Sequence, residues 1–349
     1  MDLSDFETRA GEWLRGTGPE PDVVMSSRIR LARNVAGFPF ATRATDDQKA
    51  EILARMKAAS GQLPVGTRRW FVEVSGSSAI ESRLLHERHL ISAELDKGKG
   101  PRGVVFGADE RVSVMVNEED HLRLQALRSG LALEPAFDDA VALDRAIEEK
   151  LPYAVSPQYG YLTACPTNVG TGLRASVMLH LPALVYARHM EKVFQAASRT
   201  GLAVRGFYGE GTKAMGDFYQ ISNQVTLGTA EADILENLSR MLPTILQYER
   251  EVRQYLAKDR RVRLEDKVHR ALAVLRAART IGSDEAMELL SAVRLGVVLE
   301  LLSAPDLTTV NESFVLVQPA HVQKLSGRTL SEEERDAARA TLLRERLAG

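Results

Sequence analysis

Polar and apolar residues alternate at several places in the N-terminal part of the chain, and this pattern predicts β-strands. Residues 111–116 read Arg-Val-Ser-Val-Met-Val, and residues 23–33 also alternate. A two-residue period is typical of a strand with one buried face. Residues 202–212 and 216–226 predict two more strands that enclose a glycine-punctuated loop.

Other segments have the three-to-four-residue period of amphipathic helices. The stretch Thr45-Asp46-Asp47-Gln48 has the form of a capping box, so we expect a helix from there to about residue 60. Further helices are expected, in chain order, at residues 80–85, 122–131 and 136–151, from residue 175, and at residues 183–198.

Helical patterns dominate after residue 230. Helices are predicted at residues 230–257, 264–280 and 284–302, and the spacing of Ser331 and Glu334 predicts a further capped helix. The highly charged stretch 258–263 separates the first of these helices from the rest. We therefore expect two domains, residues 1–257 with strands and helices, and residues 258–349 with helices alone.

Composition narrows the class of protein. The 349 residues are 44% apolar and 26% charged, as in soluble globular proteins, and the net charge of -2 argues against nucleic acid as an obligate partner. No apolar run approaches the ~20 residues of a membrane span, and the N-terminus does not have the order of a signal peptide. We expect a cytoplasmic protein with no membrane partner. The single cysteine, Cys165, excludes an intrachain disulfide.

Two arginines in the first predicted strand suggest an anion-binding face. Arg28 and Arg30 are two residues apart and project from the same side of an extended segment. Their guanidinium groups repel each other unless an anion lies between them, and arginine donors suit phosphate oxygens. The pattern predicts either a polyphosphate site or a salt-bridged strand face.

An acidic stretch follows the strand at 111–116, where we expect strand to give way to helix. Residues 117–123 read Asn-Glu-Glu-Asp-His-Leu-Arg, with three consecutive carboxylates beside a histidine and an arginine. Such carboxylates repel one another unless something cationic meets them. A cationic ligand is one interpretation, and a solvated loop whose aspartate caps the next helix is the other.

Further candidates have weaker signals. The loop after Tyr161 is rich in glycine, proline and asparagine, so its backbone amides can approach an anion, but it lacks the P-loop spacing. His86 and His89 are three apart rather than four, so we predict no metal site there, and His89 either stacks on a base or is structural. Arg335 and Arg339 share one helix face, which is either a binding face or solvated.

Four motifs in order resemble the phosphagen (guanidino) kinase family. They are Ser-Ser-Arg-Ile-Arg at 26–30, the acidic stretch at 117–123, Cys-Pro-Thr-Asn-Val-Gly-Thr-Gly-Leu-Arg at 165–174, and Arg-Gly at 205–206 before the glycine-rich loop. The resemblance implies an α+β fold with an antiparallel sheet flanked by helices, joined here to a C-terminal all-α domain. It also implies ATP and Mg²⁺ as cofactors and a guanidinium group as phosphoryl acceptor.

The same resemblance assigns roles to residues. It implies that Glu119 is the base, that Glu210 supplies a second carboxylate, and that a thiolate at Cys165 tunes the acceptor guanidinium. The residues that it implies bind nucleotide are Ser27, Arg28, Arg30, His89, Arg123, Arg174 and Arg205.

Two departures from the small-molecule kinases point to a protein as the acceptor. Only 25 residues precede Ser26, where those enzymes carry a sizeable helical domain that helps to select a small guanidine. The C-terminal part adds Arg335-Asp336-x-x-Arg339-Ala340, a pattern that the resemblance associates with binding of phosphoarginine. We therefore predict a kinase that phosphorylates arginine side chains of proteins.

Two other functions stay open, a small-molecule arginine kinase and a non-catalytic phosphoarginine-binding regulator. Intact Glu119, Arg123, Arg174 and Arg205 argue against the regulator, because a decayed catalyst is expected to lose some of them. The resemblance further implies a bacterial stress response in which marked proteins are regulated or degraded. The partners it implies are an adaptor of the McsA type, a repressor of the CtsR type, the ClpC-ClpP protease and a second copy of the chain in a homodimer.

Overall fold

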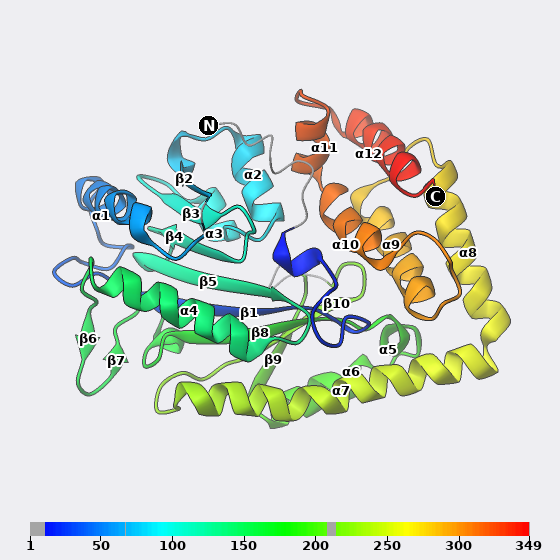
Figure 1. Cartoon of the computed structure of the whole chain (residues 1–349), viewed down its shortest axis with the longest axis horizontal. Helices are drawn as coiled ribbons and strands as arrows, with labels where there is room; N and C mark the ends of the chain where they lie inside the picture. Colours follow the sequence, from blue (N-terminus) through cyan, green and yellow to red (C-terminus); the bar gives the residue numbers. More distant parts are fainter. Residues whose placement is uncertain (1–10, 67, 208–213, 349) are drawn as a thin grey trace.

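An eight-stranded antiparallel sheet forms the centre of the N-terminal part (Figure 1). The computed structural model describes residues 11–66, 68–207 and 214–348. In spatial order the strands are β2 (Arg69–Glu73), β3 (Gly103–Gly107), β4 (Val112–Val116), β5 (Leu122–Ser129), β1 (Val24–Arg33), β8 (Leu173–His180), β10 (Phe218–Asn223) and β9 (Leu202–Arg205). A separate ribbon pairs β6 (Val155–Ser156) with β7 (Gly160–Tyr161).

Helices flank this sheet, which confirms the predicted α+β class. They are α1 (Asp46–Ala59), α2 (Ala79–Glu87), α3 (Ala93–Lys97), α4 (Leu133–Glu148), α5 (Pro182–Tyr186), α6 (Met190–Arg199) and α7 (Glu231–Asp259). Helix α4 packs on β1 and β5, and α7 packs on β8 and β10. Short 3-10 turns are η2 (Glu12–Leu14), η3 (Ser60–Gln62), η4 (Val74–Gly76) and η5 (Pro166–Asn168).

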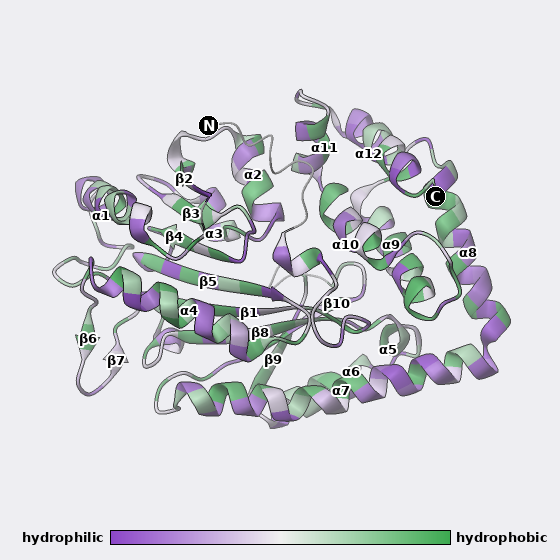
Figure 2. Cartoon of the chain, viewed as in Figure 1, coloured by the Kyte–Doolittle hydropathy of each residue, from purple (hydrophilic) through white to green (hydrophobic). Residues whose placement is uncertain are grey.

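Beyond α7 the described residues form helices and their connecting loops, with no strand, as predicted. The helices are α8 (Arg261–Ala277), α9 (Ser283–Val298), α10 (Leu307–Leu316), α11 (Pro319–Leu325) and α12 (Glu332–Arg346). Apolar and polar positions mix along α7, α8 and α12 in Figure 2, as expected of helices with one buried face. None of the helices in the described part is long and apolar enough to cross a membrane. The domain boundary at residue 258 stays a prediction.

The capping signals located helix starts correctly. The Thr45 side chain accepts a hydrogen bond from the Gln48 backbone amide at the start of α1, and the Gln48 side chain accepts one from the Thr45 backbone amide. Ser331 and Glu334 form the same reciprocal pair at the start of α12. The long helix predicted at 230–257 is α7.

Three predicted helices are wrong. Residues 122–131 and the segment from 175 belong to strands β5 and β8, and residues 183–198 are two helices, α5 and α6. Both strands lie inside the sheet, where residues on either face are buried, so their apolar runs do not distinguish strand from helix. The break between α5 and α6 occurs at Arg188, whose φ is 60°.

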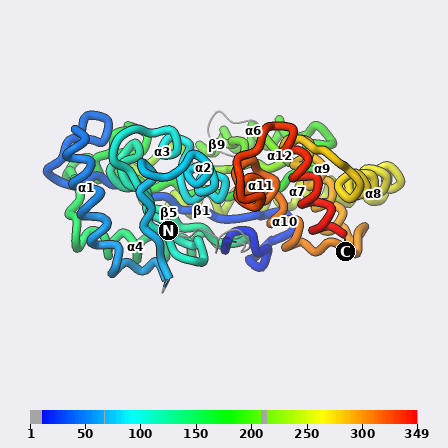
Figure 3. Tube along the Cα trace, turned by 90° about the horizontal axis from the view of Figure 1, so that it is seen from above, coloured from blue at the N-terminus to red at the C-terminus, as the bar shows by residue number. Residues whose placement is uncertain are grey.

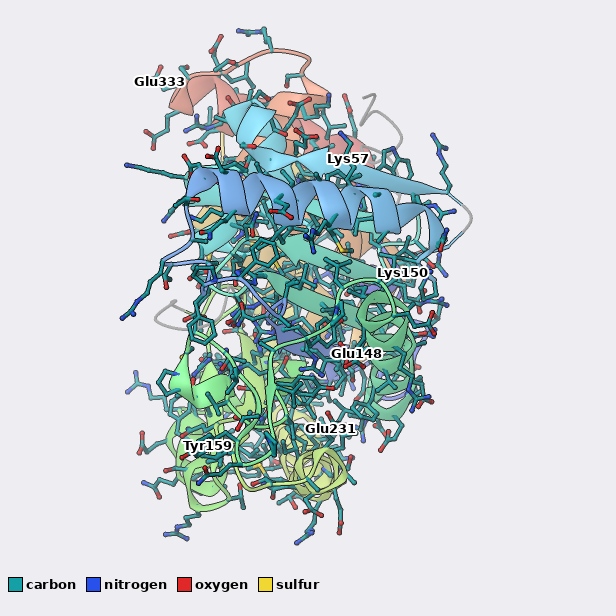
Figure 4. The ribbon with its side chains drawn as sticks, turned by 90° about the vertical axis from the view of Figure 1, so that its left-hand side faces the viewer. Lys57, Glu148, Lys150, Tyr159, Glu231 and Glu333 are labelled. Atoms are coloured by element: carbon teal, nitrogen blue, oxygen red, sulfur yellow. The ribbon has the colours of Figure 1, made fainter. Side chains whose placement is uncertain are left out.

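The C-terminal helices pack against the sheet domain rather than standing apart. Helix α11 lies beside α2 in both Figure 1 and Figure 3, and α10 contacts η2. Charged residues such as Lys57 on α1 and Glu148 at the end of α4 lie on the outside of the molecule (Figure 4). The C-terminal helices therefore share a buried boundary with the elements that build the cleft described below.

Candidate active site

Five arginines from four strands line a single cleft of about 790 Å³. Strand register brings them together: Arg30 on β1 lies directly opposite Arg174 on β8, and Arg123 on β5 pairs with Ala32 at the other edge of β1. Arg28 lies two residues from Arg30 on the same face, as predicted, and Arg205 ends β9. We call Arg28, Arg30, Arg123, Arg174 and Arg205 the clamp arginines.

The electrostatics of the cleft favour an anion. Burial, and then the nearby charge of Arg123, lowers the pKa of Arg28 to about 10. Burial and the charges of Arg28, Arg123 and Arg205 also lower the pKa of Arg30 well below its ordinary value, with Glu118 opposing them. The buried Nε atoms of Arg30 and Arg174 have no hydrogen-bond partner in the described part of the chain. A polyphosphate would supply both the missing acceptors and the missing negative charge.

Two polar residues on β10 orient the clamp arginines and were not predicted. Arg28 Nη2 donates to Gln220 Oε1 at 2.8 Å, and Arg174 Nη2 donates to Ser222 Oγ at 3.2 Å. Gln220 and Ser222 are two residues apart on one strand, so they face the same side. The sequence signal that could have identified them is their spacing of two residues within a predicted strand.

The acidic stretch is the hairpin between β4 and β5, and its carboxylates have separate tasks. Glu118 is buried, pairs with Arg123 Nη1 at 2.5 Å and accepts a hydrogen bond from the Ser92 hydroxyl. The Glu119 side chain is 38% exposed and lies 3.4 Å from Arg123 Nη2. Burial raises the pKa of Glu119, neighbouring carboxylates raise it further, and Arg123 opposes the rise. A half-exposed carboxylate with a raised pKa at the cleft suits a proton acceptor.

The third carboxylate, Asp120, is structural. It is fully buried and its Oδ1 accepts hydrogen bonds from Asn34 Nδ2 and from the backbone amide of Ala164, each at 2.6 Å. The interpretation of an aspartate that caps the next helix is therefore wrong, because a strand follows. Instead, Asp120 fixes the loop that carries Cys165.

Cys165 and His89 both lie in the cleft. Cys165 Sγ is 3.0 Å from the hydroxyl of Thr167. The His89 ring meets the rings of Trp13 and Phe207 edge-on, with centroids 4.9 Å and 5.3 Å away. Burial, followed by the charge of Arg28, lowers the pKa of His89, so the ring is neutral and offers a flat face rather than a charge.

Ser27 and Glu210 were also predicted for the site. Ser27 is fully buried on the opposite side of β1 from Arg28, where its hydroxyl donates to the Gly130 carbonyl and accepts from the Ala132 amide. Strand alternation turns the Ser27 side chain away from the cleft, and its place among the nucleotide-binding residues stays a prediction. Glu210 lies outside the described residues.

The predicted phosphoarginine-binding residues lie on α12, away from the cleft. Arg339 is 1% exposed, donates to the carbonyls of Val317 and Ile281 at 2.7 Å each, and pairs with Asp336. The Asp336 side chain is 31% exposed, and Arg335 is partly exposed and donates to the Leu330 carbonyl. Arg335 and Asp336 therefore present polar atoms at the surface, whereas Arg339 holds Asp336 from within.

Comparisons with known proteins agree with this architecture. The family model described as ATP:guanido phosphotransferase, C-terminal catalytic domain, matches residues 51–252, and the one described as protein-arginine kinase McsB C-terminal domain matches residues 261–349. The solved lombricine kinase has a TM-score of 0.58, 25% identity, and coverage of 74% of this chain and 73% of that one. A taurocyamine kinase from Schistosoma mansoni has a TM-score of 0.59 and 25% identity over 74% of this chain and 37% of that one.

Fold, cleft and family match define an ATP:guanido phosphotransferase catalytic domain. Full-length relatives narrow the class. Proteins named protein-arginine kinase from Halothermothrix orenii and Symbiobacterium thermophilum are each 45% identical to the chain, the first over 99% of both proteins and the second over 100%. The chain belongs to the protein-arginine kinase family.

Proposed function

We propose that this protein transfers the terminal phosphoryl group of ATP to arginine side chains of proteins. The observation that carries the proposal is the convergence of the clamp arginines on one cleft with Glu119 beside them. Full-length similarity to relatives named protein-arginine kinase supports the choice of acceptor. The Glu119 side chain is partly exposed, so an arginine on the surface of another protein would reach it from solvent.

The chain contributes position and charge to the reaction. The clamp arginines would hold the phosphates and offset the charge that develops on the transferred group. Mg²⁺, when bound with ATP, supplies further charge neutralisation at the phosphates. Phosphate oxygens are ordinary ligands of Mg²⁺ and would hold it together with ATP.

Glu119 would prepare the acceptor. A guanidinium group has a pKa above ~12 and is a poor nucleophile until it is oriented and loses a proton. The Glu119 carboxylate would accept that proton as the nitrogen–phosphorus bond forms, and its raised pKa makes it a better acceptor than an ordinary carboxylate. Glu210 as the second carboxylate and Cys165 as a thiolate that tunes the guanidinium are part of the same proposal.

The test offers the purified protein Mg²⁺-ATP with either free arginine or an unfolded, arginine-rich protein. Mass spectrometry at neutral or basic pH then detects phosphoarginine, whose phosphoramidate bond is acid-labile. We expect phosphate on protein arginines alone, and none with the Glu119→Ala variant. Phosphate on free arginine would favour the small-molecule kinase instead. No phosphate on either acceptor would leave a phosphoarginine-binding regulator or an enzyme that requires its adaptor.

The C-terminal helix α12 supports a second site in the proposal. Arg335 would meet the phosphate of phosphoarginine and Asp336 its guanidinium nitrogens, while buried Arg339 fixes the Asp336 carboxylate. Binding of product there would couple to activity, in line with a homodimer built through this region. An Arg335→Ala, Asp336→Ala double variant should lose affinity for a phosphoarginine peptide, and retained affinity would count against the site.

The cellular partners rest on resemblance alone. We propose a cytoplasmic stress-response role with an adaptor of the McsA type, a repressor of the CtsR type and the ClpC-ClpP protease. Co-purification from cells with each candidate, compared between the intact protein and the Glu119→Ala variant, separates partners that bind the kinase from those that require its product.

A further inference from the structure

A buried hydrogen-bonded pair, Glu87 and His321, links the C-terminal helices to the cleft. Glu87, the last residue of α2, accepts hydrogen bonds from the backbone amides of Ala320 and His321 at the start of α11, at 2.9 Å and 3.1 Å. Its Oε2 also lies 2.8 Å from His321 Nδ1. Both side chains are 1% exposed. Contacts this deeply buried tie the position of α11 to the end of α2.

The link continues through the next residue of the chain. Arg88 Nη1 lies 3.4 Å from His321 Nε2, and Arg88 Nε donates to Glu110 Oε1 at 2.6 Å. Arg88 is itself 3% exposed. His89 follows Arg88 directly, has a φ of 59° and lines the cleft. A non-glycine residue in this left-handed conformation is held there by its surroundings, and the residue before it, Arg88, contacts His321 of α11.

A second connection reaches the same histidine through aromatic rings. Phe314 on α10 meets Phe218 on β10 with centroids 4.8 Å apart, and Phe218 meets Phe207 at 5.4 Å. Phe207 in turn meets the His89 ring at 5.3 Å. All three phenylalanines are at most 1% exposed. Helices α10 and α11 therefore reach His89 by two independent routes.

We propose that α10 and α11 are part of the nucleotide site, because they hold His89 in the position that receives the nucleotide. Glu87, His321 and Phe314 are positioning residues that act through His89. The inference rests on the proposed function, in which the nucleotide occupies the arginine-lined cleft. It makes the C-terminal helices necessary for nucleotide affinity, and not for affinity toward the protein acceptor at Glu119.

The first test is the His321→Ala variant of the full-length chain. Calorimetric titration with Mg²⁺-ADP should give affinity weaker by about 2- to 30-fold, the range over which residues that couple sites ordinarily act. The KM for ATP should rise in parallel while the KM for an unfolded protein acceptor stays unchanged. Glu87→Gln should act in the same direction with smaller size, because its amide oxygen still accepts hydrogen bonds from α11.

His321→Asn and Gln323→Ala are the controls. Asparagine keeps a donor near the place of Nδ1 and should recover most of the affinity for Mg²⁺-ADP. Among the described residues, Gln323 bonds only within the C-terminal helices, to the Leu330 amide and the Pro319 carbonyl, so its loss tests general destabilisation of α11. Equal loss of nucleotide affinity in Gln323→Ala and His321→Ala would overturn the proposal, as would a folded His321→Ala variant with unchanged affinity.

His89→Ala separates this inference from the proposed function. If His89→Ala weakens Mg²⁺-ADP binding and His321→Ala leaves it unchanged, the role of α11 is overturned and the nucleotide site at His89 stands. Unchanged binding in His89→Ala would instead overturn the placement of the nucleotide against His89, and the inference would fall with it.

Discussion

Two groups of arginines in this protein, one half-buried and one buried, have different surroundings. The clamp arginines converge on the cleft, where like charges lie close together and two Nε atoms have no partner among the described residues. A second group, which we call the interior arginines, is at most 2% exposed and lies within the fold. Its members are Arg33, Arg253, Arg294 and Arg339.

The interior arginines have carboxylates or carbonyls at their donors. Arg33 pairs with Asp144 at 2.8 Å, and Arg253 pairs with buried Glu249 at 2.7 Å. Arg294 donates to the carbonyls of Pro21 and Asp22. A lowered pKa does not separate the groups, since burial, and then Arg253, also lowers the pKa of Arg294 to about 9. The hydrogen-bond partners separate them: the interior arginines meet carboxylates and carbonyls of the fold, whereas the Nε atoms of Arg30 and Arg174 in the clamp have no partner among the described residues.

The largest effect is expected at the carboxylate beside the clamp arginines. Glu119→Gln should lower kcat for phosphorylation of a protein acceptor by about 10²- to 10⁴-fold, because the amide cannot accept the guanidinium proton. The melting temperature should stay close to that of the original protein, since Glu119 is only loosely paired with Arg123. Quantitative mass spectrometry of phosphoarginine measures the rate. Wild-type activity in this variant would remove Glu119 as the base.

Removal of an interior arginine should cost stability. Arg253→Met leaves Glu249 buried without its partner, so we expect the free energy of unfolding to fall by about 3–5 kcal/mol. Urea denaturation measures the loss. The matched control is Arg240→Met on the same helix, whose pair with Glu236 is exposed and whose loss should change stability by less than about 1 kcal/mol. Similar losses in both variants would contradict the distinction between buried and exposed pairs.

Removal of a clamp arginine should preserve stability and weaken nucleotide binding. Arg30→Met relieves repulsion from Arg28 and Arg123, so the free energy of unfolding without ligand should be unchanged or higher. Affinity for Mg²⁺-ADP should fall by about 10- to 100-fold, as expected for a lost hydrogen bond between charged groups. Urea denaturation and calorimetric titration give the two quantities. A marked loss of stability would place Arg30 among the interior arginines.

The smallest effect concerns pH. The base form of Glu119 is lost as the pH falls through its raised pKa, so kcat should decline on acidification above the usual carboxylate range. Glu94 lies in the same cleft and its charge raises the pKa of Glu119. Glu94→Gln should therefore move the acidic limb of kcat to lower pH. Glu148→Gln, at the end of α4 (Figure 4), is the control and should leave the limb in place.

Local sequence signals predicted some of this architecture and missed the rest for a physical reason. Capping boxes at Thr45 and Ser331 and the long apolar period of α7 identify helices, because these signals lie within a few residues of each other. Strands β5 and β8 were predicted as helices, because interior strands lack clear alternation. Long-range pairing decides which strands are neighbours in the sheet, so the sequence of each segment alone does not predict them.

The site residues also divide into those that local spacing predicted and those that long-range strand pairing brings together. The spacing of Arg28 and Arg30 alone predicted their shared face, whereas Arg174 reaches them only through the register of β1 and β8. The resemblance to a known family supplied that convergence before the structure did. Neither source predicted that Glu87 and His321 would meet, since 234 positions of chain separate them.

The most direct test of the distinction between clamp and interior arginines is the melting temperature with and without Mg²⁺-ADP. It is measured for the original protein, for Arg30→Met and for Arg253→Met. We predict that the nucleotide raises the melting temperature of the original protein and of Arg253→Met, although the latter melts lower throughout. In Arg30→Met the starting temperature should be preserved and the nucleotide-induced rise should largely disappear. A full nucleotide-induced rise in Arg30→Met, or its loss in Arg253→Met, would contradict the account.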